Sequence, residues 1–243
     1  MSAATDSSIR DQAGGPVVTD AFLETEQCEA LLDELRFAWW QPSTVVERDD
    51  GRALVSVESG CRVSESAQQA WFPHVLATLL DRIEERLHHL RGVEPRNLEP
   101  WQAVRYRVGG RFDLHHDGGV FAAEPAGERN TTILLYLNTP EAGGGTHFPE
   151  LERVVAARAG RLVTWDNLTV DGSPDPRVRH RALPVRAGTK TILTTWEREH
   201  PTKGPLPSPD QEAHPLAGRG GPLPHRGRRS PAPTPRWKDT HDQ

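Results

Sequence analysis

The stretch RFDLHHDGG, residues 111–119, places two histidines immediately before an aspartate. Side chains on an extended strand alternate between its two faces, so His115 and Asp117 point the same way and His116 points the opposite way. An imidazole and a carboxylate that converge from one strand form two thirds of the facial triad that binds non-haem Fe(II). A single H-x-D pair is weak support for such a site, because the triad needs a second histidine from a distant strand.

His180 is a candidate for the second histidine, since it begins a predicted strand after the turn-rich segment 171–179. Lys190 follows ten residues later and is the only lysine among the first 202 residues, in a chain that otherwise uses arginine. An ammonium group near an iron site is suited to bind the carboxylate of a cosubstrate. If His180 joins the 115/117 pair, Lys190 would lie beside the metal centre.

Two amphipathic helices are predicted ahead of the strands that carry these residues. The first covers residues 25–37, with Thr25 as a possible cap, and the second begins near Pro73 and ends at Gly92. Each helix has an apolar stripe at helical spacing. The stripe residues are Cys28, Leu31, Leu32 and Leu35 in the first helix, and Leu76, Leu79, Leu80, Ile83, Leu87 and Leu90 in the second.

From Trp101 onward the pattern changes to short strands separated by turns rich in Gly, Pro and Asp. The predicted strands are residues 101–108, 111–117, 131–138, 146–150, 152–167, 180–185 and 189–199. Helices followed by such strands predict a mainly β fold with flanking α-helices, as in a β-sandwich or jelly roll.

Two polar segments that contain glycine, 41–67 and 118–128, are predicted loops that could close over the site. The first of them could equally be a plain hairpin. His116 is expected to point away from the site, and His147 is expected on the strand face opposite Thr146 and Phe148.

The composition predicts one folded domain, residues 16–200, between an N-terminal segment 1–15 and a C-terminal tail 201–243 that are both disordered. The tail holds ten of the 21 prolines and too little apolar surface to offset the entropy of ordering it. Before the tail there are 22 basic and 30 acidic residues, and this acidic balance argues against nucleic acid as the main partner.

Residues 1–15 lack the apolar core of a secretory signal or anchor, and no apolar run approaches the roughly 18 residues of a membrane helix. The two cysteines are too few for a disulfide framework or a thiolate metal site. We therefore expect a soluble, cytoplasmic protein without a membrane partner.

The ordered motifs together resemble the prolyl 4-hydroxylase-like branch of the Fe(II)/2-oxoglutarate-dependent dioxygenases, over roughly residues 17–199. That family carries the motif Y-x-x-G-x-x-[YF]-x-x-H-x-D. It also carries later blocks that resemble three stretches of this chain: GERNTTILLYLN, GGGTHFP and the segment from the turn-rich loop to Lys190. The first motif is matched by Tyr106, Gly109, Phe112, His115 and Asp117, and the later blocks by residues 127–138, 143–149, 171–190 and Trp196. The resemblance implies a double-stranded β-helix, which is a cupin-like jelly roll.

The resemblance also implies a role for each matched residue. His115, Asp117 and His180 would ligate Fe(2+), while Lys190 would pair with the distal carboxylate of 2-oxoglutarate. Tyr136 would hydrogen-bond that carboxylate and Tyr106 would line the cosubstrate pocket. The implied reaction uses O2 and converts 2-oxoglutarate to succinate and CO2 while an unactivated C–H bond is hydroxylated, with ascorbate as a supporting reductant.

The substrate is less well defined by the sequence. Arg129 and Trp196 match family positions near the substrate, and Phe112 stands where prolyl hydroxylases often have tyrosine, which removes a hydroxyl contact. The compact single domain favours a small amino-acid-type substrate, with a peptidyl-prolyl 4-hydroxylase as the alternative. A further alternative is a non-catalytic jelly roll that binds metal or acts as a sensor. The oligomeric state is open.

Overall fold

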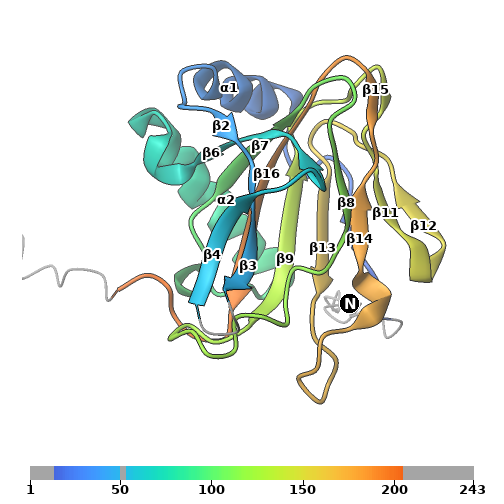
Figure 1. Ribbon diagram of the computed structural model, residues 1–243. Helices are drawn as coiled ribbons and strands as arrows, with labels where there is room; N and C mark the ends of the chain where they lie inside the picture. The colour runs from blue at the N-terminus through green and yellow to red at the C-terminus, as the bar shows by residue number, and fades with distance from the viewer. Residues whose placement is uncertain (1–13, 50–52, 205–243) are drawn as a thin grey trace, which may run out of the picture. The chain divides into compact units, whose positions relative to one another are not determined.

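The computed structural model describes residues 14–49 and 53–204 (Figure 1). Most of the N-terminal segment 1–15 and of the tail 201–243 lies outside these residues, so their predicted disorder and the 16–200 domain boundaries stay predictions. Within the described ranges, no helix is both long and apolar enough to cross a membrane.

Helix α1, Thr25–Leu35, is the first of the two predicted helices. Its N-cap is Glu24, whereas the sequence had suggested Thr25. The Gln27 side-chain oxygen accepts a hydrogen bond from the Glu24 backbone N–H at 3.0 Å, which satisfies a donor at the start of the helix.

Helix α2, Ala77–Arg91, follows a 3-10 turn at His74–Leu76 and ends at Gly92, which has φ +69° and so suits glycine. Of the predicted stripe, Leu76, Leu80, Ile83 and Leu87 are buried and Leu79 is partly buried, but Leu90 is 50% exposed, contrary to the prediction. The chain reverses at Gly92, and Val93 after the turn is buried.

The larger sheet has seven strands in the order β1-β13-β9-β16-β7-β6-β2, and every neighbouring pair is antiparallel. Its strands are β1 Val17–Thr19, β2 Gln41–Pro42, β6 Glu65–Gln68, β7 Gln102–Tyr106, β9 Arg129–Tyr136, β13 Leu162–Asp166 and β16 Lys190–Arg198. Both helices lie against one face of this sheet (Figure 1).

The smaller sheet has five strands in the order β12-β11-β14-β8-β5 and faces the other side of the large sheet (Figure 1). Its strands are β5 Arg62–Val63, β8 Arg111–His115, β11 Thr146–Phe148, β12 Arg153–Val155 and β14 His180–Ala182. A short pair, β10 Ala142–Gly143 with β15 Val185–Ala187, lies apart from both sheets. The predicted jelly roll with flanking helices is confirmed.

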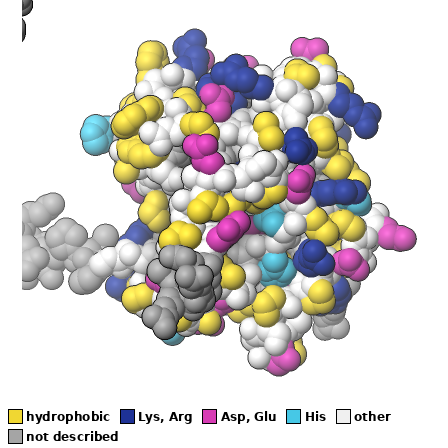
Figure 2. Space-filling view, in the orientation of Figure 1, with side chains coloured by type: hydrophobic (Ala, Val, Ile, Leu, Met, Phe, Trp, Pro, Cys, Tyr) yellow, Lys and Arg dark blue, Asp and Glu magenta, His cyan; other side chains and the backbone are white. Residues whose placement is uncertain are grey.

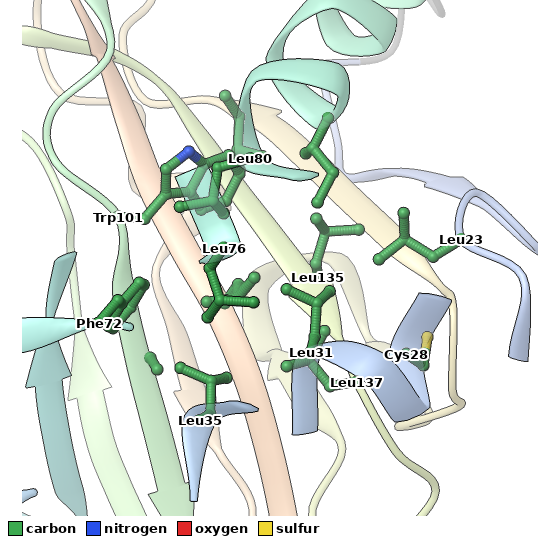
Figure 3. Packing of buried hydrophobic residues seen from close by; sticks show 14 of the residues in the cluster. Leu23, Cys28, Leu31, Leu35, Phe72, Leu76, Leu80, Trp101, Leu135 and Leu137 are labelled. Atoms are coloured by element: carbon green, nitrogen blue, oxygen red, sulfur yellow. The ribbon is translucent and has the colours of Figure 1, made fainter. Parts of the chain in front are cut away.

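Strand β9 shows how alternation divides the core into two layers. Ile133 and Leu135 pack with the helices, whereas Leu134 and Tyr136 pack between the two sheets. Figure 3 shows the helix-side layer, in which Leu135 meets leucines of α1. The helices pack on one face of the large sheet, and the cavity that holds the candidate site lies on the other face, between the sheets.

Segment 41–67, predicted as a polar loop or a hairpin, contains a hairpin of β3 Thr44–Asp49 and β4 Ala53–Glu58. The hairpin stands in front of the large sheet (Figure 1), and Val45, Val46 and Ser56 from it line a cavity next to His115. Strands β3 and β4 thus form a hairpin that borders the site, and a lid role for it stays a prediction.

Candidate active site

The structure brings His115, Asp117 and His180 together. His115 ends β8 and is the register partner of His180, which begins the neighbouring strand β14, while Asp117 follows two residues beyond β8. The Nε2 atom of His115 lies 3.7 Å from Oδ1 of Asp117, and Nε2 of His180 lies 3.7 Å from Oδ2. The three potential ligand atoms all lie within 4.8 Å of one another.

Backbone carbonyls orient both imidazoles. Nδ1 of His115 donates to the Asp113 carbonyl at 2.8 Å, and Nδ1 of His180 donates to the Val178 carbonyl at 3.0 Å. A carbonyl oxygen can only accept, so each Nδ1 carries the proton and each Nε2 presents its lone pair towards Asp117.

Burial lowers the pKa of His115 to about 3, with the nearby His180 as the next cause, and burial likewise lowers the pKa of His180. Burial opposes ionisation of Asp117, but His180, His115, Arg129 and the Thr132 hydroxyl together hold its pKa below the ordinary value. Two neutral imidazoles and one carboxylate are the donor set of the non-haem iron facial triad, so these residues fit Fe(II).

A cavity extends from this cluster between the two sheets, and Lys190 and Tyr106 lie on its wall. The two residues are register partners on β16 and β7, and Nζ of Lys190 lies 3.9 Å from the centre of the Tyr106 ring. Lys190 is 1% exposed, and within residues 14–49 and 53–204 no carboxylate lies at ion-pair distance from it. Burial, followed by the charge of Arg62, lowers its pKa to about 7.

A buried lysine without a carboxylate partner is costly unless an anion binds there. The cavity therefore has a buried cationic side chain, Lys190, on its wall together with the cluster of potential metal ligands His115, Asp117 and His180.

Tyr136 is fully buried and its hydroxyl is 2.6 Å from Oγ1 of Thr146. Burial raises the pKa of Tyr136 to about 12, so the hydroxyl keeps its proton as a hydrogen-bond donor. Thr146 borders the cavity, whereas Tyr136 stands behind it. Sequence reasoning missed Thr146, although the residue lies within the GGGTHFP motif.

The substrate-proximal candidates lie on the mouth of the cavity. Arg129 donates to both carboxylate oxygens of Glu99 at 2.7 Å, and its guanidinium lies 3.7 Å from the centre of the Trp196 ring. Phe112 stacks on the His115 ring, with centroids 3.6 Å apart. Arg129, Trp196 and Phe112 all line the wider outer part of the cavity, next to the β3–β4 hairpin.

Glu99 and Arg62 are further cavity residues that the motifs did not single out. Arg62 donates to the Thr44 carbonyl at 2.9 Å and to the Gln102 side chain at 3.0 Å, which joins the base of the hairpin to the large sheet. No local pattern marks either residue, since Arg62 binds Thr44 and Gln102, 18 and 40 positions away, and Glu99 binds Arg129, 30 positions away.

His116 borders the outer part of the cavity but is not one of the three clustered ligand candidates, and His147 lines neither part of the cavity. The His116 ring accepts a hydrogen bond from the Gly118 N–H at 3.0 Å and contacts the Asp175 carbonyl at 3.0 Å. His147 accepts a hydrogen bond from Arg181 at 3.0 Å on the far face of β11. Figure 2 shows histidines near the centre of the visible face, with acidic and basic side chains interspersed around them.

Comparisons with known proteins agree with this arrangement. Residues 101–198 match the model of the 2OG-Fe(II) oxygenase superfamily. Prolyl 4-hydroxylase subunit alpha-1 of Gallus gallus is 35% identical over 144 residues, which are 57% of this chain and 27% of that protein. The chain thus spans about a quarter of the length of this curated relative.

Two solved structures share the fold. The 2OG complex of the viral collagen prolyl hydroxylase from Paramecium Bursaria Chlorella virus-1 superposes with a TM-score of 0.55 at 22% identity, covering 79% of this chain and 99% of that one. A Trichoplax adhaerens prolyl hydroxylase in complex with a hypoxia inducible factor peptide fragment gives a TM-score of 0.53 at 16% identity, covering 77% and 84%. The double-stranded β-helix implied by the motifs is confirmed. The chain is thus similar over residues 101–198 to the 2OG-Fe(II) oxygenase superfamily, and over 144 residues to prolyl 4-hydroxylase subunit alpha-1.

Proposed function

We propose that this protein is an Fe(II)- and 2-oxoglutarate-dependent dioxygenase that hydroxylates prolyl residues of a peptide or protein. One observation carries the proposal: the His115/Asp117/His180 cluster and the buried ammonium of Lys190 share a single cavity. A divalent cation and a dianionic cosubstrate would each find a complementary partner there.

The sequence favoured a small amino-acid-type substrate, and the relatives favour the peptide alternative. The 35% identical protein is a prolyl 4-hydroxylase subunit, and the Trichoplax enzyme was solved with a peptide fragment. The mouth of the cavity supports the same choice, because it is wide and lined by apolar and aromatic side chains such as Val46, Phe121 and Trp196. Such walls suit a pyrrolidine ring held within an extended chain.

When bound, iron together with 2-oxoglutarate and O2 would supply the oxidative chemistry, with succinate and CO2 as coproducts. The chain's residues hold and orient the reactants. His115, Asp117 and His180 present three ligands from one side, and Lys190 neutralises the distal carboxylate of the cosubstrate. Tyr106 would line the cosubstrate end, and the Tyr136 hydroxyl would support it through Thr146.

At the outer end, Arg129 is held rigidly by Glu99 and by the Trp196 ring. Arg129 and Trp196 would position the peptide, while Phe112 packs on His115 and keeps one side of the metal site dry. Apolar side chains of Leu134, Trp165 and Ile192 complete the inner wall. These roles are proposals for the residues that line the cavity.

The function is tested with purified protein, Fe(II), 2-oxoglutarate and ascorbate, offered a panel of proline-containing peptides and, separately, free proline and other amino acids. We expect succinate formation and a mass gain of one oxygen atom in the peptides. Conversion of free amino acids without conversion of peptides would favour the small-molecule alternative. Metal binding without any turnover of 2-oxoglutarate, with or without substrate, would favour the non-catalytic alternative.

A further inference from the structure

The carboxylate of Asp117 has a buried hydrogen-bond partner on the large sheet. The Thr132 hydroxyl, on β9, lies 2.8 Å from Oδ2 of Asp117, and Thr132 is 1% exposed. Each oxygen lies 3.7 Å from Nε2 of one histidine, Oδ1 from His115 and Oδ2 from His180, but among the described residues only Oδ2 accepts a side-chain hydrogen bond. The two oxygens of this carboxylate are therefore in different environments.

Asn167, which follows β13, fixes the direction of the Thr132 hydrogen bond. Its Nδ2 donates to Oγ1 of Thr132 at 2.9 Å, and Asn167 is fully buried. A hydroxyl has one proton, and its two acceptors here are Oδ1 of Asn167 at 3.2 Å and the charged Oδ2 of Asp117 at 2.8 Å. The shorter, charge-assisted bond goes to Asp117. The pairs form a directed chain from the Asn167 amide through the Thr132 hydroxyl to the Asp117 carboxylate.

Two backbone hydrogen bonds hold Asn167 in place. The backbone N–H of Asn167 donates to the Asn130 carbonyl at 2.7 Å, and the backbone carbonyl of Asn167 accepts from the Asp175 N–H at 2.8 Å. A Cβ added at Gly118 would lie 3.3 Å from Cβ of Asn167, so the chain beyond Asp117 also packs closely here. Thr132 lines the cavity and Asn167 does not, and the side chain of Asn167 is linked by hydrogen bonds to Asp117 through Thr132.

We propose that Thr132 and Asn167 are positioning residues that hold Asp117 so that Oδ1 is the oxygen presented to the metal. This inference rests on the proposed function, in which Asp117 is a ligand. In a buried site a hydrogen bond to an ionised carboxylate is strong, and its loss frees the carboxylate to rotate. Partners that orient a ligand in this way typically affect metal affinity about 10- to 100-fold.

The test uses Co(II) as the probe, because its affinity is measured by titration and its visible d–d absorption reports coordination without any turnover. Thr132→Val keeps the shape of the side chain and removes the hydroxyl, so we expect about tenfold or more weaker Co(II) binding and an altered d–d spectrum. Thr132→Ser, which restores the hydroxyl, should bind within about threefold of the unsubstituted protein and keep its spectrum. Far-UV circular dichroism of each variant shows that it is folded.

Two further variants separate a positioning role from a general packing role. Thr131→Val lies on the opposite face of β9, where its hydroxyl contacts Asp166 at 3.4 Å, and it should leave Co(II) affinity unchanged. Asn167→Leu should weaken binding less than Thr132→Val, and the Thr132→Val/Asn167→Leu double variant should bind no more weakly than Thr132→Val alone. That non-additivity is the signature of Asn167 acting through Thr132.

The outcomes distinguish this inference from the proposed function. If the unsubstituted protein fails to bind Co(II), or His180→Ala binds it equally well, the proposed metal centre is wrong. If the unsubstituted protein binds Co(II), His180→Ala loses it, and Thr132→Val retains both affinity and spectrum, only the positioning role is overturned. Fully additive losses in the double variant would overturn the role of Asn167 alone.

Discussion

Lys190 and Tyr106 lie directly opposite each other on neighbouring strands, with the lysine ammonium 3.9 Å from the centre of the tyrosine ring. The ring gives the ammonium a favourable contact but no counter-charge. Burial and the nearby Arg62 therefore lower the pKa of Lys190 to about 7, well below the ordinary value of 10.5. The cation that is proposed to bind 2-oxoglutarate thus titrates near neutral pH.

The affinity for 2-oxoglutarate should consequently depend on pH. Below about pH 7 the free site carries the positive charge, and above it the charge is lost, so the dissociation constant of 2-oxoglutarate should rise with pH, approaching about tenfold per unit. Calorimetric titration of the metal-loaded protein between pH 6 and pH 9 measures this. Lys190→Arg is the control, because a guanidinium stays charged over that range. An affinity independent of pH in the unsubstituted protein would contradict the prediction.

Removal of the ammonium should affect the cosubstrate far more than the metal. Lys190→Ala deletes a charge-assisted contact worth roughly 1.5–3 kcal/mol, so half-saturation by 2-oxoglutarate should rise about 10- to 100-fold. Co(II) affinity should stay nearly unchanged. Lys203→Ala is the matched control, since Lys203 contacts Glu84 at 2.6 Å and does not line the cavity. An unchanged requirement for 2-oxoglutarate would remove Lys190 from its proposed role.

Replacement of His180 and replacement of His116 should have opposite effects on turnover. His180→Ala removes one of the three proposed ligands, so we expect no measurable turnover and weaker metal binding. His116→Ala removes hydrogen bonds to Gly118 and Asp175, each worth about 1 kcal/mol of stability, but should keep most of the activity. Succinate formation and metal content measure both variants. A dead His116→Ala enzyme beside an active His180→Ala enzyme would reverse the assignment of strand faces.

The position at which the tail is removed should matter. Lys203 pairs with the buried carboxylate of Glu84, which also accepts a hydrogen bond from the Trp101 indole at 3.1 Å, and the Thr202 N–H donates to the Arg96 carbonyl. A chain ending at Gly204 should therefore keep its melting temperature and turnover. A chain ending at Thr202 should keep turnover but lose about 1 kcal/mol, or roughly 2–4 °C in melting temperature, because Lys203 is partly exposed. Loss of soluble protein for the Gly204 variant would show that the tail contributes to folding.

Local patterns predicted most of the elements because their causes are local. The period-two alternation of β9 assigns Leu134 and Leu135 to opposite faces, and the glycine after α2 ends that helix. The pattern was less reliable at helix ends. At those ends a cap depends on one side chain, Glu24 rather than Thr25, and the burial of Leu90 depends on how far the sheet extends.

The sequence by itself determined the H-x-D pair, the candidate His180, the single early lysine and, through ordered motifs, the resemblance to the Fe(II)/2-oxoglutarate-dependent dioxygenases. Only the tertiary structure decided that segment 41–67 is a hairpin beside the cavity, that Glu99 holds Arg129, and that Asn167 reaches Asp117 through Thr132. The physical reason is the distance along the chain. These contacts join residues on strands whose pairing and facing are set by the packing of two sheets, and no short stretch of sequence encodes which distant side chain will lie opposite.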